Sequence, residues 1–168
     1  KLIVKQDGAE IGEYTANQVL DTEINIDLSN KTLGVVGVGN VGSKVANLGE
    51  MLGFKLMRND PFKLHEPCIP YYELEELAEN CDIITFHVPL TALTKGMINE
   101  KFLVALKRTP VIINSSRGDI VDTASLLRHG NMLGGLVLDV WPGEPEINGD
   151  LLELADIASP HIAGYSLE

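Results

Sequence analysis

Residues 33–42 read Leu-Gly-Val-Val-Gly-Val-Gly-Asn-Val-Gly, a short apolar run that leads directly into three spaced glycines. The spacing Gly37-x-Gly39-x-x-Gly42 is the fingerprint of a dinucleotide-binding turn when a strand precedes it and a helix follows. The first glycine permits the tight turn, the second lets the backbone approach a pyrophosphate, and the third lets the helix pack closely on the strand. The phosphates then lie at a helix N-terminus, where free N–H groups and the helix dipole favour an anion.

The context of this turn is a repeating alternation of strands and helices beyond residue 30. The expected strands are 33–38, 54–57, 82–88, 111–114, 136–140 and 156–159, and the expected helices are 41–52, 74–78, 99–106 and 122–128. Strands this apolar are typical of a parallel sheet that helices cover on both faces. The alternation predicts right-handed βαβ units and a doubly wound α/β fold, which is a Rossmann-type dinucleotide-binding domain.

The chain divides at about residue 30. Residues 31–168 carry the alternating pattern and are predicted to form the dinucleotide-binding domain. Residues 1–30 are rich in acidic and polar residues, with a possible helix near 12–20. We expect them to form a connecting segment outside the main sheet.

The composition limits the classes of protein that this chain can represent. Its 168 residues are 45% hydrophobic, which suffices for one domain with a core and excludes disorder. The net charge of −11 disfavours binding to nucleic acid or to anionic membranes, and no apolar run approaches the roughly 20 residues of a membrane helix. Cys68 and Cys81 fit no metal-binding spacing. We therefore expect a cytoplasmic protein with reduced thiols, no metal site and a small-molecule ligand.

An acidic residue lies at the position that selects between dinucleotides. Asp60 follows Gly42 by 18 residues and ends the second predicted strand. A carboxylate there can accept hydrogen bonds from the adenosine ribose hydroxyls and repels a 2′-phosphate. The sequence therefore predicts NAD rather than NADP, although Asp60 could instead be a solvated turn residue before Pro61.

Three ionisable residues follow predicted strands at the edge of the sheet where ligands bind. Arg117 follows the strand 111–114, Glu144 follows the strand 136–140, and His161 follows the last short strand. Guanidinium can hold a carboxylate in a planar, two-pronged way. Imidazole exchanges protons near neutral pH, and an adjacent carboxylate favours its protonated form. Together these groups suit hydride chemistry on a 2-hydroxy acid, with a nicotinamide carrying the hydride.

Each of these residues also has a simpler interpretation. Arg117 could be a turn residue before a glycine, Glu144 a solvated loop residue, and His161 a cap on a strand end. Their joint placement at strand ends favours the catalytic interpretation. Asp139 also ends a strand on this edge, where it could contact the nicotinamide carboxamide.

Six ordered motifs resemble those of the D-isomer-specific 2-hydroxyacid dehydrogenases, from about Ile11 to Glu168. They are Gly37-Val-Gly-Asn-Val-Gly42, Thr85-Phe-His-Val-Pro-Leu-Thr91, Ile113-Asn-Ser-Ser-Arg-Gly118, Leu138-Asp-Val-Trp141, Gly143-Glu-Pro145 and Ser159-Pro-His-Ile-Ala-Gly164. The resemblance implies that Arg117 binds substrate, that His161 is the acid and base, and that Glu144 orients and charges it. It also implies that Tyr165 reaches the substrate. The residues implied to line NAD are Gly37, Gly39, Asn40, Val41, Gly42, Asp60, Val88, Pro89, Ser115, Ser116, Asp139 and Gly164.

Within this family, the stretches 139–148 and 161–168 are most similar to the erythronate-4-phosphate dehydrogenase branch. That similarity implies oxidation of 4-phospho-D-erythronate to its 2-oxo acid in pyridoxal 5′-phosphate biosynthesis, by a homodimer. Two alternatives stay open: a dehydrogenase for another D-2-hydroxy acid such as 3-phosphoglycerate, or a NAD-sensing binding protein related to transcriptional corepressors.

The chain also departs from the family pattern. The family's separate substrate domain is built mainly from a segment before Ile11, and the family chain continues past Glu168. We therefore expect the chain to be the cofactor half of the enzyme with all three catalytic residues. Alone, it is expected to bind NAD weakly and not to turn over.

Overall fold

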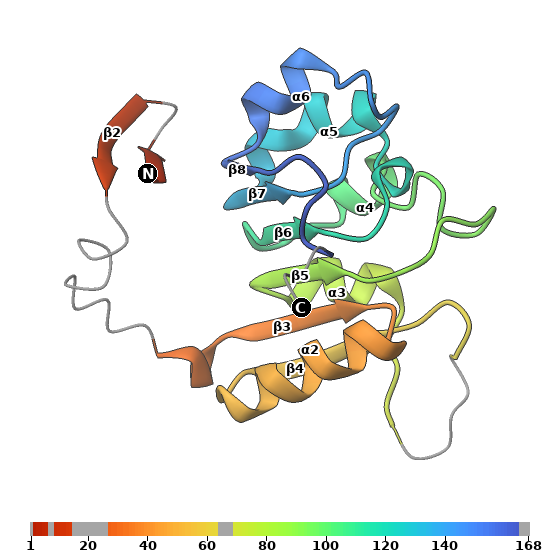
Figure 1. Ribbon diagram of the computed structural model, residues 1–168. Coiled ribbons are helices and arrows are strands. Elements are labelled where there is room, and N and C mark those ends of the chain that lie inside the picture. The colour runs from red at the N-terminus through yellow and green to blue at the C-terminus, as the bar shows by residue number, and fades with distance from the viewer. Residues whose placement is uncertain (1, 7–8, 15–26, 64–68, 165–168) are drawn as a thin grey trace.

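A six-stranded, all-parallel sheet organises the computed structural model, which describes residues 2–6, 9–14, 27–63 and 69–164 (Figure 1). The strand order is β4-β3-β5-β6-β7-β8. Their bounds are β3 (Thr32–Val36), β4 (Lys55–Asn59), β5 (Ile83–Phe86), β6 (Val111–Asn114), β7 (Gly135–Leu138) and β8 (Ile157–Ala158). The order reverses at β3, as in a doubly wound sheet, so the predicted fold class is confirmed.

In the described part of the chain, five α-helices pack on the two faces of this sheet. They are α2 (Asn40–Met51), α3 (Leu74–Asn80), α4 (Glu100–Val104), α5 (Thr123–His129) and α6 (Gly149–Leu154). Helix α2 buries Ala46 against Leu33 and Val35 of β3. Successive strand residues point to opposite faces, so Val36 faces the other way, into the cluster that α3 to α6 cover. Among the described helices, α2 thus covers one face and the other four cover the opposite face.

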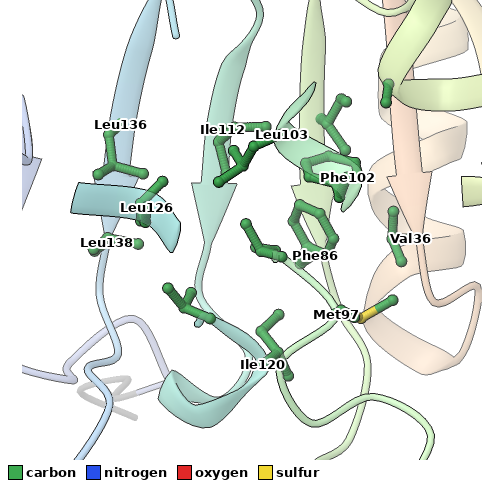
Figure 2. Packing of buried hydrophobic residues seen from close by; sticks show 14 of the residues in the cluster. Val36, Phe86, Met97, Phe102, Leu103, Ile112, Ile120, Leu126, Leu136 and Leu138 are labelled. Carbon is green, nitrogen blue, oxygen red and sulfur yellow. The ribbon is translucent and has the colours of Figure 1, made fainter. Parts of the chain in front are cut away.

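The larger cluster forms the main core of the domain. Phe86 of β5 and Phe102 of α4 meet edge to face, with ring centroids 6.0 Å apart (Figure 2). Ile112 and Leu136 lie opposite each other on β6 and β7, and both are almost fully buried. Burial of a large aliphatic side chain contributes about 1.5–3 kcal/mol. This packing holds the strand ends, and the loops that follow them, in fixed positions.

Local side-chain chemistry explains where the helices begin and end. The Asn99 side chain accepts a hydrogen bond from the Phe102 N–H, and the Asp122 side chain accepts one from the Ser125 N–H. These residues lie at the starts of the helices expected over 99–106 and 122–128, so both predicted starts are confirmed. Gly53 follows α2 with φ of 94°, a conformation that glycine adopts without strain. Helix α6 was not predicted, although Asn148 caps it in the same way.

The predicted element bounds differ from the structure mainly at strand ends. The first strand was expected to reach Val38, but β3 ends at Val36, because Gly37 already turns with φ of 87°. Near the N-terminus, β1 (Leu2–Gln6) and β2 (Ala9–Tyr14) pair in a sheet of their own. The helix predicted near 12–20 is therefore wrong for residues 12–14, and the rest of it lies outside the described residues. The boundary at residue 30 stays a prediction.

The parallel arrangement brings the predicted site residues to one edge. Each of the parallel strands ends on the same side of the sheet, and a predicted site residue follows most of them. Gly37 follows β3, Asp60 follows β4, and Asp139 follows β7 directly. Ser115 and His161 lie within a few residues of the ends of β6 and β8. The fold thus builds the candidate site from loops that are distant in sequence.

Candidate active site

The glycine turn has the geometry that its spacing predicts. Gly37 has φ of 87°, and a Cβ there would lie 2.7 Å from the carbonyl oxygen of His87. A Cβ on Gly42 would collide with the carbonyl oxygen of Gly37. By contrast, a Cβ on Gly39 would meet nothing within 4 Å. The protein's own packing thus requires glycine at positions 37 and 42. The open space at Gly39 suits the close approach of a ligand.

The start of α2 suits the phosphates of a dinucleotide. Gly39 is its N-cap and has no side chain to satisfy the free N–H groups of the first turn. Asn40 and Val41 are exposed there, and Val41 is 61% exposed. The partial positive charge of a helix N-terminus attracts an anion at this point. The residues present therefore fit the pyrophosphate of NAD.

Asp60 is bonded to the glycine turn itself. Its Oδ2 accepts a hydrogen bond from the Val38 N–H at 2.8 Å, and its Oδ1 accepts one from the Phe62 N–H at 3.0 Å. The residue is only 4% exposed. Lys63 donates from Nζ to the Val38 carbonyl oxygen at 3.3 Å, a contact that the sequence did not indicate. Asp60 therefore shapes the turn, and its contact with the ribose stays a prediction.

An arginine near the ribose can bind the 2′-phosphate of NADP, but Arg58 forms an ion pair with Glu50. It ends 3.6 Å from the Glu50 carboxylate on α2, and its side chain is 17% exposed. The residues on β4 alternate in direction, so Arg58 points to the α2 face.

The loop after β5 forms the next wall of the turn. Val88 is buried, and its side chain packs against Gly37. The carbonyl oxygen of Pro89 accepts a hydrogen bond from the Thr94 hydroxyl at 2.6 Å. The Thr94 hydroxyl also accepts one from the Thr91 N–H. The fully buried Thr94 therefore fixes the loop that carries Val88 and Pro89 beside the glycine turn.

A buried asparagine holds the loop that carries the predicted substrate anchor. Asn114 ends β6, and its Oδ1 accepts hydrogen bonds from the Ser116 N–H and hydroxyl. Its Nδ2 donates to the Arg117 carbonyl oxygen at 3.0 Å. The exposed Arg117 side chain donates to the Ser116 carbonyl oxygen at 2.6 Å. Most of its guanidinium donors remain available for a carboxylate.

Glu144 and His161 form a hydrogen-bonded pair. Their Oε2 and Nδ1 atoms lie 2.7 Å apart. Burial alone would raise the pKa of Glu144, but hydrogen bonds from His161 and from the Trp141 N–H outweigh it and lower the pKa. Glu144 is therefore ionised at neutral pH and acts only as an acceptor. Nδ1 of His161 carries the proton, which leaves Nε2 for a substrate.

Asp139 organises the backbone around His161. Its Oδ1 accepts hydrogen bonds from the Ser159 hydroxyl at 2.6 Å and the Ile162 N–H at 2.9 Å, and its Oδ2 accepts one from the Ala163 N–H at 3.0 Å. Although burial opposes the shift, these bonds lower the pKa of Asp139. The carboxylate thus closes the loop 159–163, in which His161 adopts φ of 56°. A contact with the nicotinamide carboxamide stays a prediction.

One cavity brings much of the predicted catalytic machinery together. It has a volume of about 470 Å³ and is lined by Ser115, Arg117, Asp139, Pro160, His161 and Gly164. Glu144 is not among the residues that line the cavity, but it is hydrogen-bonded to His161, which is. The predicted substrate contact Tyr165 lies outside the described residues, so its role stays a prediction.

The sequence did not indicate which residues hold the loops of the candidate site in place by hydrogen bonds. Asn114, Trp141, Ser159 and Lys63 all make the contacts given above, yet none was singled out for a role. Asn114 had a usable signal, because a buried polar side chain at the end of a largely apolar strand needs partners. Trp141 had no such signal, since its indole Nε1–H donates to the carbonyl oxygen of Ser159 in a loop that is distant in sequence.

Three further observations concern metal binding, membrane insertion and cysteine chemistry. Among the described residues, no three His, Cys, Asp or Glu side chains are grouped as metal ligands would be. Within the same part of the chain, no helix has the length and apolar character needed to cross a bilayer. The one described cysteine, Cys81, is buried, and desolvation raises its pKa to about 12.

Residues 8–163 match the family model of the D-isomer specific 2-hydroxyacid dehydrogenase, NAD binding domain. The chain belongs to this family. It is 42% identical to the erythronate-4-phosphate dehydrogenase of Bacteroides thetaiotaomicron over 172 residues, which cover 95% of this chain and 49% of the relative. It is 39% identical to the enzyme of that name from Photorhabdus laumondii, covering 92% of this chain and 43% of the relative. The chain thus spans about half the length of these relatives.

Solved structures of the family agree with the fold. The NAD-complexed D-isomer specific 2-hydroxyacid dehydrogenase of Lactobacillus delbrueckii ssp. bulgaricus superimposes with a TM-score of 0.74 at 29% identity, covering 92% of this chain and 52% of that one. The D-lactate dehydrogenase of Aquifex aeolicus, solved with NAD and lactic acid, gives 0.73 at 33% identity, covering 84% of this chain and 49% of that one. The family match and these neighbours confirm NAD as the predicted cofactor.

Proposed function

We propose that the protein carrying this domain oxidises a D-2-hydroxy acid to its 2-oxo acid with NAD. The observation that carries the proposal is the pairing of His161 with Glu144 in the cavity that Arg117 also lines. NAD, when bound, supplies the acceptor for the hydride that leaves C2 of the substrate. The glycine turn 37–42 lies at the same edge of the sheet and would hold its pyrophosphate.

In this proposal, His161 takes the hydroxyl proton of the substrate. Its Nε2 is free for that proton because Nδ1 already donates to Glu144. As the hydroxyl becomes a carbonyl, the imidazole gains a positive charge. The ionised Glu144 stabilises that charge at 2.7 Å, so the proton transfer becomes easier.

Arg117 would hold the substrate in place for this transfer. A guanidinium can bind the substrate carboxylate through two parallel hydrogen bonds, which fixes its orientation. In the reverse reaction, the positive charge of Arg117 would polarise the carbonyl group of the 2-oxo acid by attracting electron density to its oxygen. The bonds from Asn114 to the backbone of residues 116 and 117 support this position.

We propose 4-phospho-D-erythronate as the substrate, in the pyridoxal 5′-phosphate biosynthesis that the resemblance implies. The support is the name shared by relatives that are 38–42% identical over most of this chain. A cytoplasmic homodimer is part of the same proposal, since the resemblance implies it.

The test is to follow NADH absorbance with the full-length protein and a panel of D-2-hydroxy acids. We expect kcat/KM for 4-phospho-D-erythronate to exceed that for 3-phosphoglycerate or D-lactate by about 100-fold or more. A preference for another member of the panel would overturn the substrate assignment. NAD binding without turnover of any member would instead indicate a NAD-sensing binding protein.

A further inference from the structure

Trp141 lies where the loops of all three predicted catalytic residues meet. It follows β7 by three positions, and its side chain is only 3% exposed. Glu144 lies three residues further along the same loop. Ser159, two residues before His161, contacts the Trp141 ring, and Gly118, next to Arg117, contacts its backbone.

The contact with Glu144 comes from the Trp141 backbone. The Trp141 N–H donates to Glu144 Oε1 at 2.6 Å, while Glu144 Oε2 accepts from His161. Both oxygens of the carboxylate are therefore engaged, and its plane is fixed. This bond also contributes to the lowered pKa of Glu144.

The contact with the His161 loop comes from the indole ring. Its Nε1–H donates to the Ser159 carbonyl oxygen at 3.0 Å. Phenylalanine has a ring of similar character but no such donor. The bond is partly buried and the indole ring is almost fully buried, and a hydrogen bond is electrostatically stronger in such surroundings than in water.

The contact with the Arg117 loop is a close approach of backbones. A Cβ on Gly118 would collide with the Trp141 carbonyl group. Only a glycine therefore lets the loop that carries Arg117 lie directly against residue 141.

We propose that Trp141 is a positioning residue, whose indole N–H and backbone hold Glu144, His161 and Arg117 in one catalytic geometry. The effect on turnover rests on the proposed dehydrogenase function, but the effect on the geometry does not. Small displacements of reacting groups reduce catalysis strongly. Loss of the hydrogen bond from the Trp141 indole to Ser159 therefore lowers kcat more than it lowers the affinity for NAD.

The first test uses the 168-residue chain and nuclear magnetic resonance. Trp141 is the only tryptophan of the chain, so the single indole N–H signal belongs to it. We expect that signal to exchange with solvent at least 100-fold more slowly than free tryptophan. In Trp141→Phe, we expect the downfield signal of the His161 Nδ1–H to weaken. Indole exchange as fast as that of free tryptophan overturns the proposal, and this measurement needs no variant to fold.

The second test measures kinetics in the full-length protein. Trp141→Phe is expected to lower kcat about tenfold and to alter the pH profile of kcat, with KM for NAD changed less than twofold. Leu126→Ala is the matched control, because Leu126 of α5 is also fully buried in the same core, but its apolar side chain forms no hydrogen bond to these loops. We expect it to lower the melting temperature and leave the pH profile unchanged.

The outcomes separate the two proposals. Wild-type kcat and pH profile retained in Trp141→Phe overturn the positioning role. A wild-type protein that turns over no hydroxy acid contradicts the proposed function instead, and the resonance measurements then still decide the role of Trp141.

Discussion

Nδ1 of His161 lies 2.7 Å from Oε2 of Glu144, although 17 residues separate them in the chain. The pair is formed by two loops that follow β7 and β8, which are neighbours in the sheet. The side chain of His161 is 50% exposed and that of Glu144 is 31% exposed. The imidazole therefore faces the cavity, while the carboxylate lies behind it and accepts its Nδ1–H.

Removing the charge of Glu144 tests this division of roles. In Glu144→Gln, we expect kcat to fall about 100-fold, because the imidazolium formed during oxidation loses its counter-charge. The affinity for NAD, measured by calorimetry, should change less than twofold. Glu146→Gln, two residues further along the same loop, is the control and should retain wild-type kcat. Equal kcat in both variants would show that Glu144 is an ordinary loop residue.

A substitution at His161 must respect its backbone conformation. His161 has φ of 56°, which asparagine tolerates better than alanine does. In His161→Asn, we expect kcat to fall by about 10²–10⁴-fold, since the proton acceptor is lost. The melting temperature and the affinity for NAD should stay close to those of the wild type. A matched loss of NAD affinity and kcat would instead indicate a structural role.

Asp60 is expected to act on both the glycine turn and the choice of dinucleotide. Asp60→Ala leaves the Val38 and Phe62 N–H groups without their acceptor, which should cost about 1–3 kcal/mol of unfolding free energy. It should also narrow the ratio of the dissociation constants for NADP and NAD. Asp122→Ala, which removes a helix N-cap, is the control for stability alone. An unchanged ratio in Asp60→Ala would show that another residue sets the preference.

The lowered pKa of Asp139 predicts how the domain responds to acid. A carboxyl group whose pKa is lower in the folded state stabilises that state above its unfolded pKa of about 4. This contribution is lost as the pH falls through the folded pKa. In Asp139→Asn, the unfolding free energy from denaturant titration should therefore depend less on pH below about 4. The control is Glu153→Gln, which alters an exposed residue of α6 and should retain the wild-type pH dependence. An unchanged dependence in Asp139→Asn would contradict the prediction.

The sequence predicted structure well where a feature depends on the type of one or a few neighbouring residues. The glycine spacing at 37–42 predicted the turn, and Asn99 and Asp122 predicted helix starts, because these features depend on a few adjacent residues. It was less informative at strand ends. The bounds of β5 and β7 are shorter than the apolar runs, since pairing with neighbouring strands ends before the apolar residues do.

The sequence by itself determined the fold class, the cofactor and the identity of the candidate catalytic residues. Apolar periodicity and glycine spacing are local properties, so they can be seen along the chain. Only the tertiary structure decided how those residues are held. Asp139 bonds to the loop 159–163, Asp60 bonds to the glycine turn, and the Trp141 indole bonds to Ser159. These contacts join segments brought together by the parallel sheet, and no local pattern records such a pairing.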